Sequence, residues 1–302
     1  MIQLTKDITK ASAITHQGTM HADEVTAAAF LELLYDNIVI MRTSEEILPA
    51  RRADSIVFDI GKGEYDHHQK EAKIRANGIK YSAFGLLWQD RGRQLLEKMH
   101  ISEIDDVFSY IDKDFVEAID AIDNGVFPTV QAGYRIKNYS DLIKLFNPSY
   151  ASDEEEDQQF LKATRVAKEI LLAEISSVYG KVKAKSKVER LWKQHKGPIL
   201  ELPVYVPYEE TLLSLDTNQE ILFVVFPSNR GGYAAKAVPT SLSDHTNRCL
   251  FKEEWAGLTN EALQAVTQVP TARFCHVNRF LVTADTKEDI LQLVNQCLPK
   301  NE

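Results

Sequence analysis

The chain is poor in cysteine and has no long apolar run. Its 302 residues include only Cys249, Cys275 and Cys297, and no two of them form a CxxC pair. Three cysteines without such a pair argue against a disulfide framework and against a cysteine-rich zinc site. Residues 1–18 contain no apolar segment followed by a cleavage pattern, and no run approaches the roughly 18 apolar residues of a membrane helix. We therefore expect a cytoplasmic protein without a membrane span.

Positive charge is also scarce. The chain has 35 Lys and Arg against 44 Asp and Glu, which gives a net charge of −9. This balance disfavours a protein that holds nucleic acid by bulk charge, because such binding relies on basic side chains at the phosphates. It does not exclude an enzyme that binds a phosphate through metal ions, because bound metal ions reverse the sign of the local electrostatic potential.

The first third of the chain alternates strand-like and helix-like stretches. Short β-branched or apolar runs predict strands at 12–15, 37–41 and 55–60, and helical spacing after an acidic first turn predicts a helix from His21 to Tyr35. Strands separated by helices indicate a parallel sheet with crossover helices, and hence the α/β class. Further helices are expected at 81–99, 103–124, 142–146 and from about 153 to Tyr179.

The composition of the sequence changes after Tyr179. Residues 181–196 carry seven Lys and Arg against the single acidic Glu189, and beyond Pro198 the pattern becomes rich in strands again. A basic run of this kind would guide a nucleic-acid strand by charge, or form an ordinary solvated helix face. We expect an α/β domain at 1–150, a helical linker at 151–197 and a smaller α/β domain at 198–302.

Ligand-type side chains gather in the first domain. Four of the eight histidines fall within the first 68 residues, each beside a carboxylate or another histidine. In chain order, the groups are His16, His21, Asp23 and Glu24 at a strand-to-helix junction, Asp59 after the next strong strand, then Asp66, His67 and His68, and finally Asp120 and Asp123 on one helix face. Open α/β sheets bind ligands at the carboxyl edge of their strands, where the first of these groups are expected to meet.

Mixed imidazole and carboxylate ligands suit Mn²⁺, with Zn²⁺, Fe²⁺ and Co²⁺ as alternatives. The candidate ligands are too many for one ion, so two ions bridged by Asp59 would use them better. Such a pair activates water for in-line attack at phosphorus. Adjacent residues in extended chain point to opposite sides, which gives His67 and His68 different tasks, one on a metal and one on the substrate phosphate. The simpler alternative is that Asp23 and Glu24 complement a helix N-terminus and that Asp123 is a solvated helix residue.

These motifs together resemble the DHH phosphoesterase superfamily. The resemblance is closer to its Myg1-like branch, described as metal-dependent hydrolases and 3′–5′ RNA exonucleases. The matching segments are THQGTMHADE (15–24), DIG (59–61), YDHHQ (65–69), SAFGL (82–86), DAIDNG (120–125), WAGL (255–258), EAL (261–263) and FCH (274–276) followed by Phe280. Departures are Met20 for an aromatic residue, and Lys62 and Arg279 where glycine is usual.

The resemblance implies a DHH-like catalytic domain at 1–150 and a substrate-binding domain at 198–302. It further implies that metal ions are held by His16, His21, Asp23, Asp59, His67 and Asp123, with His68 near the phosphate. We expect two ions, Mn²⁺ or Mg²⁺. We assign catalysis to His68, Asp59 and Glu24, and substrate binding to Arg248, His276 and Lys236.

The expected function is therefore hydrolysis of single-stranded RNA or short oligonucleotides from the 3′ end. A phosphodiesterase or pyrophosphatase that acts on a small phosphoester is the alternative, and a non-catalytic metal-binding protein is a third. An open cluster rich in carboxylates is poorly suited to a purely structural ion, which disfavours the third. The sequence is compatible with a homodimer but does not decide the oligomeric state.

Overall fold

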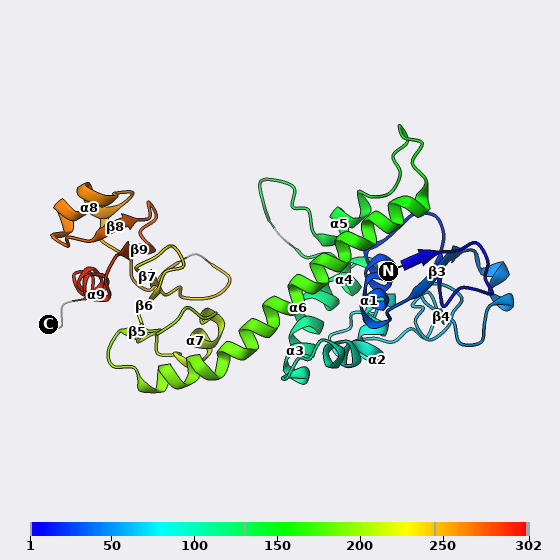
Figure 1. Cartoon of the computed structure of the whole chain (residues 1–302), viewed down its shortest axis with the longest axis horizontal. Helices are drawn as coiled ribbons and strands as arrows, with labels where there is room; N and C mark the ends of the chain where they lie inside the picture. The colour runs from blue at the N-terminus through cyan, green and yellow to red at the C-terminus, as the bar shows by residue number, and fades with distance from the viewer. Residues whose placement is uncertain (1, 130, 245, 300–302) are drawn as a thin grey trace. The chain divides into compact units, whose positions relative to one another are not determined.

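The chain folds into two compact units, each with its own sheet. The structure is a computed structural model that describes residues 2–129, 131–244 and 246–299. Unit 1 comprises residues 1–179 and unit 2 comprises residues 180–302 (Figure 1). Among the described residues, no helix is both long enough and apolar enough to cross a membrane.

A parallel four-stranded sheet forms the base of unit 1. Its strands are β1 (Ile2–Leu4), β2 (Ala13–His16), β3 (Ile38–Thr43) and β4 (Ile56–Val57), in the order β1-β3-β2-β4. Every pair is parallel, which confirms the sheet predicted from the sequence. The chain goes from β2 to β3 on one side and then to β4 on the other. The carboxyl end of β2 is therefore a topological switch point, where open α/β sheets bind their ligands.

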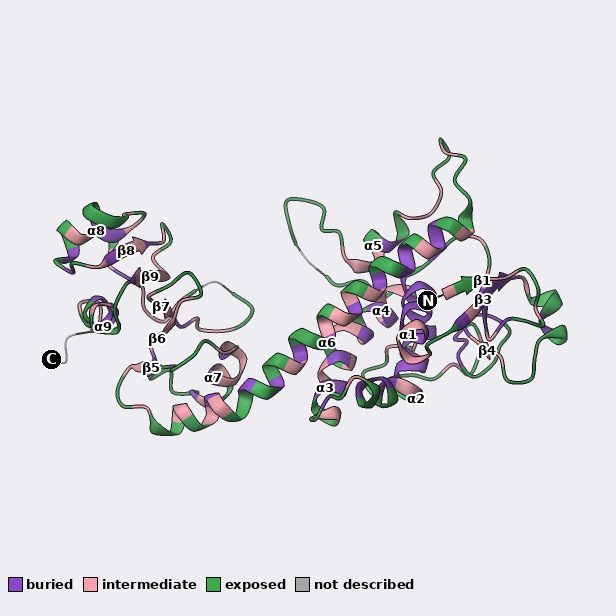
Figure 2. Ribbon diagram, in the orientation of Figure 1, coloured by how far each residue is buried: buried purple, intermediate pink, exposed green. Residues whose placement is uncertain are grey.

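Helices cover this sheet and build most of the core of unit 1. They are α1 (Ala22–Leu34), α2 (Ala83–Lys98), α3 (Ile104–Ile111), α4 (Glu117–Asp123), α5 (Tyr139–Lys144) and α6 (Glu156–Gln194), with a 3₁₀ turn at Glu45–Ala50. The first ten residues of α1 are all buried (Figure 2, purple), because α1 lies between the sheet and the other helices. Trp88 of α2 stacks on Phe108 of α3 with ring centroids 5.4 Å apart, which joins the next layer.

The helix predicted over 103–124 exists but is not regular throughout. A π-helical segment, Asp112–Val116, joins α3 to α4 without a break in the helical path. Such a segment accommodates extra backbone inside an α-helix and often occurs near functional sites. Here it directly precedes α4, the helix that carries Asp120 and Asp123.

A buried ion pair fixes α4 against the start of α2. The guanidinium of Arg75 donates to Asp120 at 2.8 Å and to Asp112 at 2.7 Å, and the hydroxyl of Ser82 donates to Asp120 at 2.7 Å. Burial raises the pKa of Asp120 to about 6, against the hydrogen bonds from Ser82 and the charge of Arg75. Gly85 is required beside it, because a Cβ there would lie 2.2 Å from a carboxylate oxygen of Asp120.

Helix α6 runs through both units. Its buried residues recur at helical spacing, namely Phe160, Ala163, Ala167, Leu171, Ile175, Val178, Val182 and Val188. The prediction that this helix ends near Tyr179 is wrong, because it continues through Gly180 and the basic stretch to Gln194. Lysine is a good helix former, and Val182 and Val188 are buried on this part of the helix, which offsets the cost of one glycine. Lys181, Lys185 and Lys193 are exposed.

Unit 2 holds a mixed five-stranded sheet with helices on both faces. Its strands are β5 (Ile199–Glu201), β6 (Phe223–Pro227), β7 (Tyr233–Ala237), β8 (Ala272–Cys275) and β9 (Leu281–Ala284), in the order β5-β6-β7-β9-β8. Only β5 and β6 are parallel, and the remaining pairs are antiparallel. Helices α8 (Asn260–Thr267) and α9 (Lys287–Asn295) join one apolar cluster, whereas α7 (Glu209–Leu215) and Val188 of α6 join another. The sequence pattern did not predict β1 or α7, and 55–60 forms a shorter strand than expected.

Replacement of Arg75 by leucine tests the buried pair. Arg75→Leu leaves the carboxylate of Asp120 buried without its counter-charge, and we expect a loss of about 3–5 kcal/mol in unfolding free energy. Urea denaturation measures this loss. Arg52→Leu is the matched control, because the pair between Arg52 and Asp54 is exposed and its removal should cost less than about 1 kcal/mol. Equal effects of the two substitutions would contradict this role of Arg75.

Candidate metal centre

Asp59 occupies the middle of the candidate centre. It follows β4, and its φ of +56° lies in the left-handed region, which aspartate tolerates better than most residues. Its backbone N–H donates to the carbonyl of Tyr65 at 2.9 Å, which closes the loop that directly precedes His67 and His68. The carboxylate is buried, with the residue 3% exposed. The loop geometry thus directs one carboxylate to the carboxyl edge of the sheet.

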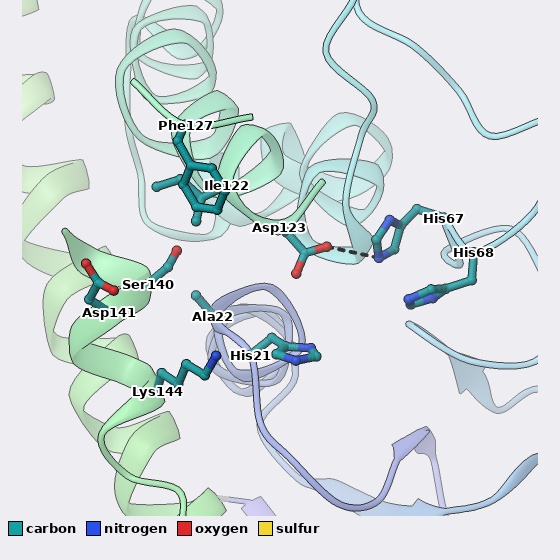
Figure 3. Close-up of a pocket in the computed structure, with 10 residues that line it drawn as sticks. All are labelled: His21, Ala22, His67, His68, Ile122, Asp123, Phe127, Ser140, Asp141 and Lys144. Atoms are coloured by element: carbon teal, nitrogen blue, oxygen red, sulfur yellow. Dashed lines mark ion pairs between the residues drawn. The ribbon is translucent and has the colours of Figure 1, made fainter. Parts of the chain in front are cut away.

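Imidazoles flank both oxygens of Asp59. Nε2 of His16, at the end of β2, lies 3.1 Å from Oδ2, and Nε2 of His67 lies 3.2 Å from Oδ1. Nδ1 of His68 is 3.4 Å from Oδ1, and Nε2 of His67 is also 3.1 Å from Asp123 (Figure 3). One carboxylate therefore lies between two separate sets of nitrogen ligands.

Among the residues that the structure describes, three overlapping groups of side chains have ligand atoms within 4.8 Å of one another. They are His16, His21, Glu24 and Asp59; Asp59, His67 and His68; and His21, Asp23 and Asp123. Asp59 and His21 each belong to two groups. Every metal ligand expected from the sequence thus falls in this one cluster, together with Glu24 and His68.

The Nδ1 atom of three histidines has an acceptor outside the cluster. Nδ1 of His16 lies 3.0 Å from the carbonyl of Gln17, Nδ1 of His67 lies 3.4 Å from Oδ1 of Asn124, and Nδ1 of His68 lies 3.0 Å from Asp66. Such partners fix the ring orientation and the tautomer of metal-binding histidines. They leave Nε2 of His16 and His67 facing the carboxylates.

The cluster concentrates negative charge that the protein only partly neutralises. Burial raises the pKa of Asp23 well above its usual range, raises that of Glu24 to about 8 and raises that of Asp123. Burial opposes the charged forms of Asp59 and His16 too, but their mutual attraction outweighs it. The pKa of Asp59 falls to about 2 and that of His16 rises to about 9. Additional positive charge is needed before all four carboxylates ionise together.

Orphaned oxygens show that the residues fit metal ions. Both carboxylate oxygens of Asp59 and Oδ1 of Asp23 are buried, and among the described residues none of these atoms has a hydrogen-bond partner. The imidazole nitrogens that surround Asp59 are near enough to donate but are not aligned to do so. Oxygen and imidazole donors that converge without bonding to one another suit Mn²⁺ or a related divalent ion.

Other acidic residues of the motifs have structural roles. Asp120 is bound to Arg75 and Ser82, and Asp66 accepts from the backbone N–H of Lys62 and of His68. Neither belongs to the three ligand groups. Asn124, which contacts His67, is a residue of the site that the sequence reasoning missed, although it lies directly after Asp123 in a motif segment.

The substrate-binding candidates of unit 2 have partners within that unit. The side chain of Arg248 is 3% exposed and pairs with Asp216, so its charge is already compensated in the core. Lys236 pairs with Glu209. His276 begins the turn between β8 and β9, and its Nδ1 accepts from the backbone N–H of Asn278 at 3.0 Å. None of these three joins the ligand groups of the cluster.

Comparison with known proteins places the chain in a family. The model of the MYG1 exonuclease family, described as an uncharacterised protein family (UPF0160), matches residues 12–298. The chain belongs to this family. It is 28% identical to the MYG1 exonuclease of Rattus norvegicus, over 94% of this chain and 84% of that protein.

The relatives extend beyond animals. The chain is 28% identical to the MYG1 protein of Saccharomyces cerevisiae, over 94% of each chain. It is 26% identical to the MYG1 protein of Chlamydia muridarum, over 94% of this chain and 95% of that one. A solved structure of a pGpG-specific phosphodiesterase from Vibrio cholerae aligns with 95% of this chain and 97% of its own, at 12% identity and a TM-score of 0.32. A TM-score of this size carries no argument about fold or function.

The two departures from glycine occupy glycine-like backbone. Lys62 has a φ of +55° and Arg279 a φ of +58°, both in the left-handed region. The backbone thus keeps the conformation that glycine favours although the side chain has changed. For a residue with a Cβ, this conformation costs about 1–2 kcal/mol.

The role of Asn124 is tested by metal affinity. Asn124→Ala removes the acceptor at Nδ1 of His67, and we expect Mn²⁺ binding to weaken by about 10–100-fold. Isothermal titration of metal-stripped protein measures the change. Asn77→Ala, in an exposed turn, is the control. An unchanged affinity for the Asn124 variant would show that His67 does not need this partner.

Lys62 offers a test of the loop backbone. Lys62→Gly should be more stable than Lys62→Ala by about 0.5–1 kcal/mol, because the relief of the left-handed conformation exceeds the extra entropy that glycine gives the unfolded chain. Thermal and urea unfolding of the two variants measure the difference. A more stable alanine variant would contradict the assignment of strain to this residue.

Proposed function

We propose that this protein is a metal-dependent phosphodiesterase that shortens single-stranded RNA or short oligonucleotides from the 3′ end. Two observations support an enzyme that hydrolyses phosphoesters: the carboxylate and imidazole cluster at the sheet edge, and membership of a family whose animal relatives are named MYG1 exonuclease. RNA as the substrate and the 3′–5′ direction follow from the Myg1-like motifs. The proposed cofactors are two Mn²⁺ or Mg²⁺ ions.

The observation that carries the proposal is the position of Asp59. Its two oxygens face different partners, His16 on one side and His67 on the other, so the carboxylate is placed to be shared between two ions. His16, His21 and Asp59 would hold one ion, and Asp59, His67 and Asp123 would hold the other, with Asp23 beside Asp123 and His67. When bound, such ions activate water and stabilise the attacking and leaving oxygens of a displacement at phosphorus.

The remaining residues of the cluster orient the reactants. His68 has a side chain that is 59% exposed, and its Nδ1 lies 3.0 Å from Asp66. In the imidazolium form its Nε2 would donate to a phosphoryl oxygen or to the leaving oxygen. Glu24 lies 3.6 Å from Nε2 of His16 and accepts from the backbone N–H of His21 at 2.9 Å. We propose that the carboxylate of Glu24 accepts the proton of the attacking water.

A compact phosphoester is the second candidate substrate. A cavity of about 310 Å³, lined by His21, His67, His68 and Asp123 among others, adjoins the cluster. This volume is at the lower end of the range for ligand pockets, which suits a small molecule or a single nucleotide. The net charge of −9 also favours a substrate without a long phosphate backbone.

Metal removal and addition distinguish these functions. Metal-stripped protein is incubated with 5′-labelled single-stranded RNA and DNA, with pyrophosphate and with a simple phosphodiester, before and after Mn²⁺ is added. We expect Mn²⁺ to restore stepwise shortening of RNA. We expect Asp59→Asn and His67→Ala to reduce the rate of shortening by about 100-fold or more, because each removes a group from the site where charge develops during hydrolysis. His195→Ala, a histidine of unit 2 outside the cluster, is the control.

The pattern of products decides the outcome. A ladder that shortens from the 3′ end supports the nuclease. Turnover of pyrophosphate or of the simple diester alone would replace it with the compact-substrate function. If Mn²⁺ raises the melting temperature and nothing is hydrolysed, the protein binds metal without catalysis and the proposal fails.

A further inference from the structure

The cavity beside the metal cluster has a second wall that the cluster does not use. Besides the ligands, its lining comprises Ala22, Ile122, Phe127, Ser140, Asp141 and Lys144. Figure 3 shows Lys144 reaching toward Ala22 and His21, with Phe127 and Ile122 together on the opposite side. A cationic side chain and an aromatic ring thus face one small cavity that opens beside the metal ligands.

The aromatic ring of Phe127 is held there by the end of α4. Gly125 has a φ of +75°, its N–H donates to the carbonyl of Ile122 at 3.0 Å, and the N–H of Val126 donates to the carbonyl of Ala121 at 2.8 Å. These two bonds form a Schellman motif, which fixes the exit of the chain from the helix. Phe127 nevertheless stays 67% exposed, unlike the buried aromatic rings of the core. A large exposed ring on a fixed backbone at the mouth of a cavity offers a flat apolar surface to a ligand.

Lys144 is the lysine among the residues that line this cavity. It is the last residue of α5 and is exposed, and within the part of the chain that the structure describes its amino group has no ion-pair partner. The nearby carboxylate of Asp141 accepts from the backbone N–H of Asn138 at 3.1 Å in the cap of α5. The hydroxyl oxygen of Ser140, another lining residue, is buried and has no hydrogen-bond partner among the described residues.

We infer that this wall is a subsite for one nucleotide, in which Lys144 contacts the phosphate and Phe127 stacks on the base. The inference rests on the proposed function for its ligand class. A phosphate held at the cluster lies within one nucleotide of both side chains, because they line the same cavity of about 310 Å³ as His21, His67 and Asp123. Aromatic stacking accepts any base, so this subsite explains selection for a terminal nucleotide without selection for sequence.

Two probes separate the contributions of the base and the phosphate. Adenosine monophosphate and ribose 5-phosphate both carry the sugar and the phosphate, and only the first has a base. In calorimetric titrations with Mn²⁺ present, we expect adenosine monophosphate to bind about 5–150-fold more tightly, which is the range for one stacked base. Phe127→Ala should abolish this difference. Its ring is largely exposed, so its removal leaves the core intact.

Lys144 is tested with the same two probes. Lys144→Met should weaken both ligands by about 10-fold, since the lost contact is to the phosphate that they share, and Lys144→Arg should restore most of the affinity. Tyr150→Ala, which removes another exposed ring of unit 1 outside the cavity, should change neither affinity.

The experiments distinguish a failure of the proposed subsite from a failure of the proposed nuclease function. If wild-type protein binds both probes equally, or if Phe127→Ala keeps the difference, the subsite is refuted even when RNA is shortened. If neither RNA nor any diester is cleaved but the pattern of affinities holds, the subsite stands and the nuclease function does not.

Discussion

The free-energy cost of bringing four carboxylates together at one edge of the sheet is the constraint on which the other features of the structure depend. Asp23, Glu24, Asp59 and Asp123 are largely withdrawn from water, and their pKa values are driven apart because they cannot all ionise without compensation. His16 and His67 outweigh the burial of Asp59, but they offset the burial of Glu24 and Asp123 only in part. Divalent ions would remove the remaining conflict, so the arrangement that destabilises the protein alone is also one that suits metal ions.

Residues outside the proposed ligand set hold these carboxylates in position. The parallel sheet places His16 and Asp59 on neighbouring strands, and the buried pair of Arg75 with Asp120 holds α4 so that Asp123 faces them. Asn124 then connects the end of α4 to the ring of His67. The same helix end carries Phe127 to the rim of the cavity. One short helix therefore positions a metal ligand, the support of a second ligand and the proposed stacking surface.

The sequence predicted those parts of the site that follow from local rules. His16 and Asp59 were expected to meet because the strand ends of a parallel sheet share one edge. Helical spacing indicated both Asp120 and Asp123, and only the resemblance to Myg1-like proteins singled out Asp123. Asn124 and Lys144 were missed, because their roles depend on tertiary contacts that no local pattern encodes. The end of α6 was misplaced because the basic stretch after Tyr179 indicated a boundary, whereas packing of Val182 and Val188 extends the helix.

Crystals of the protein soaked in Mn²⁺ test the central claim most directly. Anomalous scattering locates the ions without any assumption about activity. The account predicts two peaks, one on the side of Asp59 that faces His16 and one on the side that faces His67, with the carboxylate between them. A single peak, or peaks that do not involve Asp59, would contradict the claim that this aspartate joins two metal sites.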